Sequence, residues 1–182
     1  MLARIGNMLR KRPALRYALP AAVAAALAII ALDQASKWFV VEQMNLRETL
    51  HADILPGVVS FRMAWNTGVN FGFLSGGDET SRLLLAAGTT LIALVLVASS
   101  LGCRRMISAV GLGVAAGGAI GNTIDRLNWG AVADFLNVTC CGLRNPWAFN
   151  VADIAIFAGF GLLLFPWRSP AARAPTDPTP AG

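Results

Sequence analysis

The chain alternates between long apolar stretches and polar segments. Four stretches have few charged residues and are long enough for membrane helices: about Tyr17 to Val41, Leu83 to Leu101, Met106 to Ile124, and Phe149 to Trp167. About 20 residues of helix cross the roughly 30 Å hydrocarbon core of a bilayer. The pattern predicts an all-α integral membrane protein, folded as a bundle of four transmembrane helices.

The longest polar segments predict structure on one face of the membrane. They cover about 42–82 and 125–148, between the first and second and between the third and fourth stretches. The first contains FRMAWNTGVNFGFL, in which aromatic and apolar residues alternate with small polar ones, as in short strands. A short amphipathic stretch lies near 42–50. We expect a small β-rich subdomain at the outer face.

Composition supports a membrane location. Hydrophobic residues make up 55% of the 182 residues and charged residues only 14%, and the mean hydropathy is +0.58. That leaves too little polar surface to cover a soluble globule. We expect one membrane domain at 17–167, a basic extension at 1–16, and a tail at 168–182 that is disordered because its Pro-rich composition cannot bury a core.

The basic residues indicate orientation. The net charge is +5, yet Lys and Arg neither line one helix face nor alternate with aromatic residues, so we expect no nucleic-acid partner. They cluster beside the apolar stretches, as basic residues retained in the cytoplasm do. Both termini are therefore predicted to be cytoplasmic. The first stretch exceeds signal-peptide length, which favours an uncleaved first helix.

The cysteines and the histidine of the chain do not form a pattern that indicates a metal site or a reactive thiol. Cys103, Cys140 and Cys141 have no CxxC spacing, and His51 is the only histidine. We predict no metal site and no cofactor.

Glycines are concentrated in the third stretch, GLGVAAGGAIGN. Small residues let helix backbones approach closely in lipid. We expect tight helix packing at five positions: Gly111, Gly113, Gly117, Gly118 and Gly121.

Ionisable residues near one end of the helices are the candidate chemistry. They are Asp33, Lys37, Asp125, Arg126, Asp134 and Asp153. Ionisable groups at membrane depth are costly and usually paired or functional. Two converging carboxylates share a proton and can activate water for attack on a peptide carbonyl. The spacing alone does not choose the pair.

Each group also has a structural interpretation. Asp33 and Lys37 lie four residues apart and can neutralise each other, and Asp125 beside Arg126 can anchor a loop. A simple solvated role suits Asp153 less well, because apolar helix follows it directly. A proton-coupled transporter would need charges across the whole bilayer, whereas these lie at one face. An assembly factor that docks a partner through its glycine-rich helix would not need the carboxylates.

Four polar motifs lie in order between Asp33 and Gly159. They read DQASK at 33–37, NTGVNFGF at 66–73, GGAIGNTIDRLNWGAVADF at 117–135 and FNVADIAIFAG at 149–159. With these motifs the sequence resembles the lipoprotein signal peptidase family, also called signal peptidase II. The resemblance implies an aspartic endopeptidase whose catalytic dyad is Asp134 and Asp153. It also implies residues that bind substrate or support the site: Asp33, Lys37, Asn66, Gly68, Asn122, Asp125, Arg126 and Asn150.

The resemblance further implies the substrate and location. The substrate would be a prolipoprotein whose cysteine already carries a diacylglyceryl group, cleaved just before that cysteine. The protein would act as a monomer in the bacterial cytoplasmic (inner) membrane, with lipid around it and its active site at the periplasmic face. One position departs from the family pattern, because Asn70 stands where small residues are usual.

Overall fold

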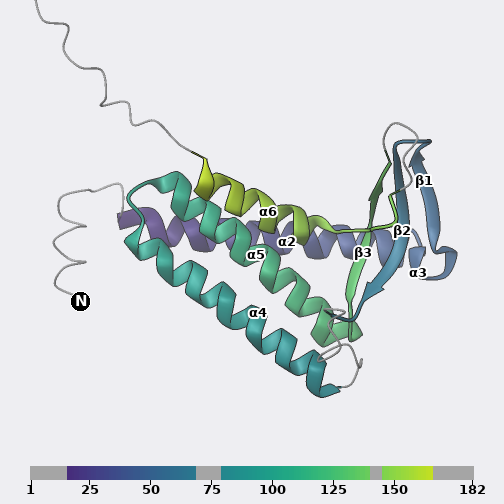
Figure 1. The fold of residues 1–182 in the computed structure, drawn as a ribbon, viewed down its shortest axis with the longest axis horizontal. Coiled ribbons are helices and arrows are strands. Elements are labelled where there is room, and N and C mark those ends of the chain that lie inside the picture. The colour runs from purple at the N-terminus through teal and green to yellow at the C-terminus, as the bar shows by residue number, and fades with distance from the viewer. Residues whose placement is uncertain (1–15, 69–78, 140–144, 166–182) are drawn as a thin grey trace, which may run out of the picture.

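The helices form an elongated bundle with a small sheet at one end (Figure 1). The computed structural model describes residues 16–68, 79–139 and 145–165. Three helical segments are long and apolar enough to cross a membrane: Ala18–Gln43, Glu79–Gly102 and Met106–Trp129. They contain α2 (Ala18–Lys37), continued by a π-helical segment (Trp38–Gln43), then α4 (Glu79–Ser99), continued by a short 3₁₀ turn, and α5 (Met106–Trp129). The first three predicted helices are confirmed.

The fourth predicted helix is shorter than expected. Helix α6 covers Val151–Leu164, 14 residues, and so rises only about 21 Å at about 1.5 Å per residue. The predicted stretch ran from about Phe149 to Trp167; Phe149 and Asn150 precede the helix, and Pro166 and Trp167 lie outside the described residues. Phe165 is extended, as is usual before a proline such as Pro166, and the helix ends there. A fourth complete crossing therefore stays a prediction.

Helix α5 lies at the centre and contacts α2, α4 and α6. Its glycines make this possible, as predicted. A Cβ added at Gly117 would lie 2.6 Å from the Ala26 carbonyl oxygen of α2. A Cβ added at Gly111 would lie 2.9 Å from the Gly159 carbonyl oxygen of α6. Two faces of α5 are thus in backbone contact with two different helices.

Replacing Gly118 should separate α5 from α6. A Cβ there would overlap the Ala152 carbonyl oxygen and lie 2.9 Å from Ile156 Cγ1, so we expect Gly118→Ala to cost about 1–3 kcal/mol of unfolding free energy. Gly88→Ala is the matched control, because a Cβ at Gly88 meets nothing within 4 Å. Alanine also favours helix by about 1 kcal/mol there. Thermal unfolding in detergent compares the two variants, and equal melting temperatures would contradict the expectation.

The sheet is antiparallel and lies across the bundle end where α2 and α5 finish and α6 begins (Figure 1). We call this the sheet end. Its strands, in spatial order, are β1 (His51–Leu55), β2 (Val59–Asn66) and β3 (Val132–Val138), and a short helix, α3 (Leu46–Thr49), precedes β1. The predicted β-rich subdomain is confirmed in this form. The sequence did not reveal β3, which lies within the segment expected to be a loop.

Strand β3 is held to the bundle by apolar packing. Phe135 is buried with Val40 and Leu46, which precede the sheet in the chain. Its ring also meets Phe61 of β2 edge to face, with centroids 5.4 Å apart. Because Asp134 is the neighbour of this anchored phenylalanine, the packing fixes the backbone that carries it.

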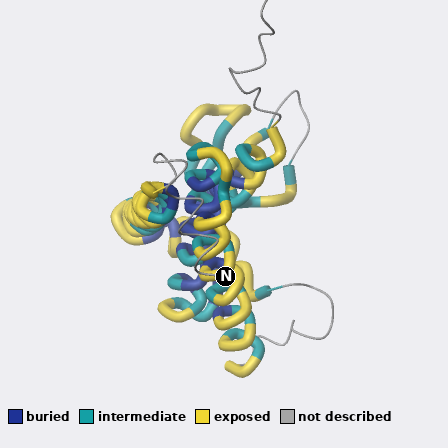
Figure 2. Tube along the Cα trace, turned by 90° about the vertical axis from the view of Figure 1, so that its left-hand side faces the viewer, coloured by how far each residue is buried: buried dark blue, intermediate teal, exposed yellow. Residues whose placement is uncertain are grey.

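The outward faces of the helices are apolar and exposed. Buried positions lie toward the interior, and exposed positions follow the outside of the helices (Figure 2). Leu84, Leu91 and Leu94 of α4 and Phe157 of α6 are among the exposed side chains. Burial of such side chains in hydrocarbon is what a membrane offers, so this surface fits a membrane-embedded protein.

Several predictions concern residues outside the described ranges. The extension at 1–16 falls there up to residue 15, as do the tail at 168–182, Asn70, Cys140 and Cys141. These predictions stay as they were made.

Candidate active site

Lys37 is the centre of a buried ionic cluster at the sheet end. Its Nζ lies 2.8 Å from Asp33 Oδ2 and 2.7 Å from Asp125 Oδ2, and all three side chains are 0% exposed. The third Nζ contact is Asn122 Oδ1, at 3.2 Å. An ammonium group has three donors, so each donor of Lys37 has one acceptor. The cluster joins α2 to α5.

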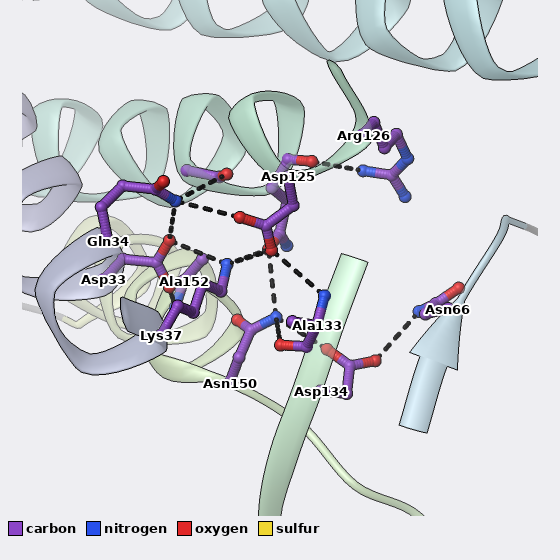
Figure 3. Close-up of polar contacts among 12 residues, drawn as sticks. Asp33, Gln34, Lys37, Asn66, Asp125, Arg126, Ala133, Asp134, Asn150 and Ala152 are labelled. Atoms are coloured by element: carbon purple, nitrogen blue, oxygen red, sulfur yellow. Dashed lines mark hydrogen bonds and ion pairs between the residues drawn. The ribbon is translucent and has the colours of Figure 1, made fainter. Parts of the chain in front are cut away.

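The two carboxylates of this cluster receive further donors. Gln34 Nε2 donates to Asp33 Oδ2 at 3.1 Å and to Asp125 Oδ1 at 3.0 Å. The Ala152 N–H donates to Asp33 Oδ1 at 2.9 Å, and the Ala133 N–H to Asp125 Oδ2 at 3.2 Å. These bonds tie the start of α6 and strand β3 to the cluster (Figure 3). Charges buried this deeply are tolerated only when they are satisfied in this way.

Asn122 connects the ionic cluster to Asp153. Its Nδ2 donates to Asp153 Oδ1 at 2.9 Å, while its Oδ1 accepts from Lys37 and, at 3.1 Å, from Asn150 Nδ2. Asp153 is therefore linked to Lys37 through one side chain.

Asn150 caps α6 and holds Asp153. The Asp153 N–H donates to Asn150 Oδ1 at 2.9 Å, and the Asn150 N–H donates to Asp153 Oδ2 at 3.3 Å, which makes a capping box. Asp153 consequently lies in the first turn of α6. There its carboxylate accepts one hydrogen bond from the Asn150 N–H and one from Asn122 Nδ2.

Asp134 lies on β3, close to Asp153. Its Oδ1 accepts from Asn150 Nδ2 at 2.7 Å and its Oδ2 from Asn66 Nδ2, on β2, at 3.2 Å (Figure 3). Burial, followed by the negative charge of Asp153, raises the pKa of Asp134 from an ordinary value of 3.8 to about 6, against the two amide donors and Lys37. Below about pH 6, Asp134 thus keeps a proton.

A cavity of about 370 Å³ reaches Asp134. Its lining comes from the end of β2, from β3, and from the segment before α6: Ala64, Trp65, Asn66, Thr67, Gly68, Asp134, Pro146, Trp147 and Ala148. Asn137 of β3 fixes one wall, because its Nδ2 donates to the Asn145 carbonyl oxygen at 2.9 Å and to that of Trp147 at 2.7 Å. The cavity is large enough for a short stretch of extended peptide.

Gly68 and Arg126 complete the predicted set. The Gly68 N–H donates to Asn66 Oδ1 at 3.2 Å and orients that amide toward Asp134. Gly68 has a φ of 141°, which favours glycine. Arg126 projects away from the Lys37 cluster (Figure 3), and its Nη1 donates to the Asn122 carbonyl oxygen at 3.1 Å.

All ten predicted site residues thus lie in one connected region. Sequence reasoning missed Gln34, which bonds both buried carboxylates, although it is a polar residue inside an apolar stretch and lies within the DQASK motif. It also missed Asn137, for which no motif gave a signal. Within the described ranges, no group of three or more His, Cys, Asp or Glu side chains is placed to hold a metal ion.

The residues of this site lie within a segment that matches a known protein family. The model of the family described as signal peptidase (SPase) II matches residues 25–167, which include every residue of this site. The chain belongs to the signal peptidase II family. It is therefore a protease embedded in a bacterial membrane.

Individual relatives agree with this assignment. A lipoprotein signal peptidase of Rhodopseudomonas palustris is 35% identical over 158 residues, a match covering 84% of this chain and 96% of the relative. One of Rhizorhabdus wittichii is 39% identical over 159 residues, covering 87% and 91%. The chain therefore spans nearly the whole length of these signal peptidases.

Solved structures support the fold. A bacterial membrane enzyme solved by the in meso method at 2.3 Å resolution superposes with a TM-score of 0.64 at 25% identity, covering 78% of this chain and 84% of that one. A second, solved at 1.9 Å, gives a TM-score of 0.65 at 24% identity, covering 78% and 88%. The arrangement of helices and sheet is thus shared with membrane enzymes.

Proposed function

We propose that the protein is an aspartic endopeptidase that removes signal peptides from diacylglyceryl-modified prolipoproteins. The observation that carries this proposal is the linked pair Asp134 and Asp153, which share Asn150 as a hydrogen-bonding partner beside a cavity. Family membership supplies the substrate class, because the relatives are lipoprotein signal peptidases. Cleavage would occur just before the lipid-modified cysteine.

The two carboxylates have different surroundings, which supports different roles. Asp153 accepts hydrogen bonds from Asn122 Nδ2 and the Asn150 N–H at the start of a helix, and we assign it the role of general base. Asp134, with its pKa raised to about 6, carries a proton and acts as the general acid. When the surroundings of two carboxyl groups push their pKa values apart, one group can act as the acid and the other as the base.

Hydrolysis then needs only water and this pair. A water oxygen attacks the peptide carbonyl carbon while its proton passes to Asp153, and the proton of Asp134 passes to the carbonyl oxygen. The tetrahedral diol collapses, the C–N bond breaks, and the amine leaves with a proton from Asp153. A proton from the diol returns to Asp134. Atoms and charges balance, and no covalent bond forms between the enzyme and the substrate.

The position of the cavity suits a substrate that stays in the membrane. The sheet lies across the ends of the apolar helices, so the cavity opens beside the membrane surface rather than at its middle. A lipid attached to cysteine would remain in the bilayer while the scissile bond reaches the carboxylates. We place the site at the periplasmic face of the cytoplasmic membrane, with both termini cytoplasmic, following the distribution of basic residues.

A purified-component assay tests the proposal. The protein in detergent, with and without a chelator, is incubated with a prolipoprotein that carries the diacylglyceryl group or lacks it. We expect cleavage of the modified precursor alone, and a product that begins with the modified cysteine. Equal cleavage of both precursors would contradict the substrate assignment, and loss of cleavage with chelator would contradict the mechanism.

The pH dependence of kcat/KM should report Asp134. Because the protonated form is the acid, activity should fall as pH rises through about 6. Asn66 stabilises the charged form, so Asn66→Ala should raise the pKa of Asp134 further and move this decline to higher pH. Normalised profiles of parent and variant make the comparison, and an unmoved or lowered decline would refute the assignment.

A proton-coupled transporter is less well supported. In the described parts of α2, α4, α5 and α6, charged side chains lie only toward the sheet end. They are Asp33, Lys37, Glu79, Arg82, Asp125, Arg126 and Asp153. A relay would need ionisable groups along the rest of the helices as well.

A further inference from the structure

The side-chain amide of Asn122 fits in one orientation only. Its Oδ1 faces Lys37 Nζ and Asn150 Nδ2, and its Nδ2 faces a carboxylate oxygen of Asp153. Lysine can only donate and a charged carboxylate can only accept. Turning the amide over would place its NH₂ group against the ammonium and its oxygen against the carboxylate. Three hydrogen bonds would be replaced by repulsive contacts.

The contacts of Lys37 serve two separate purposes. Those with Asp33 and Asp125 balance charge, and they leave a net charge of −1 on the three buried side chains. The contact with Asn122 balances no charge. Instead, this contact fixes which end of the Asn122 amide faces Lys37. Lys37 can only donate, so the oxygen of the amide must lie toward it.

We propose that Lys37 is a positioning residue for the reaction, which acts through Asn122. By fixing the Asn122 oxygen, Lys37 turns the Asn122 NH₂ group onto Asp153 and gives Asn150 Nδ2 a second fixed acceptor beside Asp134. This inference rests on the proposed dyad. Lys37 is buried and is separated from the Asp153 carboxylate by two successive hydrogen bonds. The inference gives it an effect on chemistry as well as on folding.

The inference predicts a specific kinetic signature. Lys37 does not line the cavity, so its loss should lower kcat and leave KM nearly unchanged. Without a fixed donor to Asp153, the acidic limb of the pH–rate profile, which reports the general base, should move to higher pH. The charged groups packed around this site are Lys37 and Asp33 on α2, Asp125 and Arg126 on α5, and Asp134 on β3.

The test separates positioning from charge balance. The double variant Lys37→Met/Asp125→Asn removes one positive and one negative charge, so the net charge of −1 is kept while Asn122 loses its lysine donor. We expect it to melt closer to the parent than Lys37→Met alone. We also expect kcat about 10-fold or more below the parent, KM within about twofold, and the acidic limb displaced upward.

A control variant and a second disruption sharpen the test. Thr89→Val/Thr123→Val removes a half-buried hydroxyl contact of 2.7 Å between α4 and α5 without touching the Asn122 side chain, so it should keep the acidic limb of the parent. Asn122→Leu removes the donor to Asp153 directly and should reproduce the displaced limb. If the double variant does not fold, an unmoved limb in folded Asn122→Leu still overturns the inference.

The outcomes distinguish this inference from the proposed function. If Asp134→Asn and Asp153→Asn are inactive but the folded double variant regains the parent kcat and acidic limb, the positioning role is wrong and the dyad stands. An unmoved limb in folded Asn122→Leu has the same meaning. If a folded Asp153→Asn variant keeps full activity, both proposals fail together.

Discussion

Purified Asp134→Asn and Asp153→Asn variants are expected to cleave a lipid-modified precursor about 10²- to 10⁴-fold more slowly than the parent, because each removes one proton-transferring group. Asparagine keeps the shape of aspartate and can still accept from Asn150 or Asn122. Folding should therefore change far less than activity. Initial rates at saturating substrate and thermal unfolding in detergent measure the two effects.

The matched control is Asp53→Asn. Asp53 lies on β1 of the same sheet, its side chain is 62% exposed, and its partner is His51 at 3.1 Å. The same chemical change there should leave the rate near that of the parent. A folded Asp134→Asn or Asp153→Asn variant with full activity would show that the wrong carboxylate has been named, and Asp125 would become the next candidate.

Lys37→Met should have the largest effect on stability. It leaves Asp33 and Asp125 buried with 0% exposure and without their cation, and breaking a buried ion pair in this way costs about 3–5 kcal/mol. Activity should be lost with the unfolded fraction, in addition to the lower kcat expected of the protein that stays folded. Chemical or thermal unfolding in detergent, followed by helical circular dichroism, provides the measurement.

An exposed ion pair gives the comparison. Arg47 Nη2 lies 3.0 Å from Glu42 Oε1, with side chains 46% and 42% exposed, so Glu42→Gln should change stability by at most about 1 kcal/mol. If Lys37→Met melts within a few degrees of Glu42→Gln, the cluster does not hold α2 to α5, and the role given to it here is wrong.

The sequence predicted the helices well because each apolar stretch is a local property. Length and hydropathy suffice to identify a membrane helix. They did not predict where α6 ends, because the predicted stretch continued past Pro166, which forces Phe165 out of helical geometry. They also missed β3, since only pairing with β2, for example Ala64 with Asp134, makes a strand of that segment.

For the site, the amino-acid pattern shows which residues are polar where lipid should surround them, and the family resemblance of its motifs implied Asp134 and Asp153. How these residues are joined depends on the folded chain. Asn122 and Asp153 are 31 positions apart, and Lys37 and Asn122 are 85 apart. The direction of a hydrogen bond between such residues depends on how helices pack, which here depends on backbone contact at the glycines of α5. The glycine-rich pattern indicated where a helix would pack closely, but no local pattern records which helices meet there.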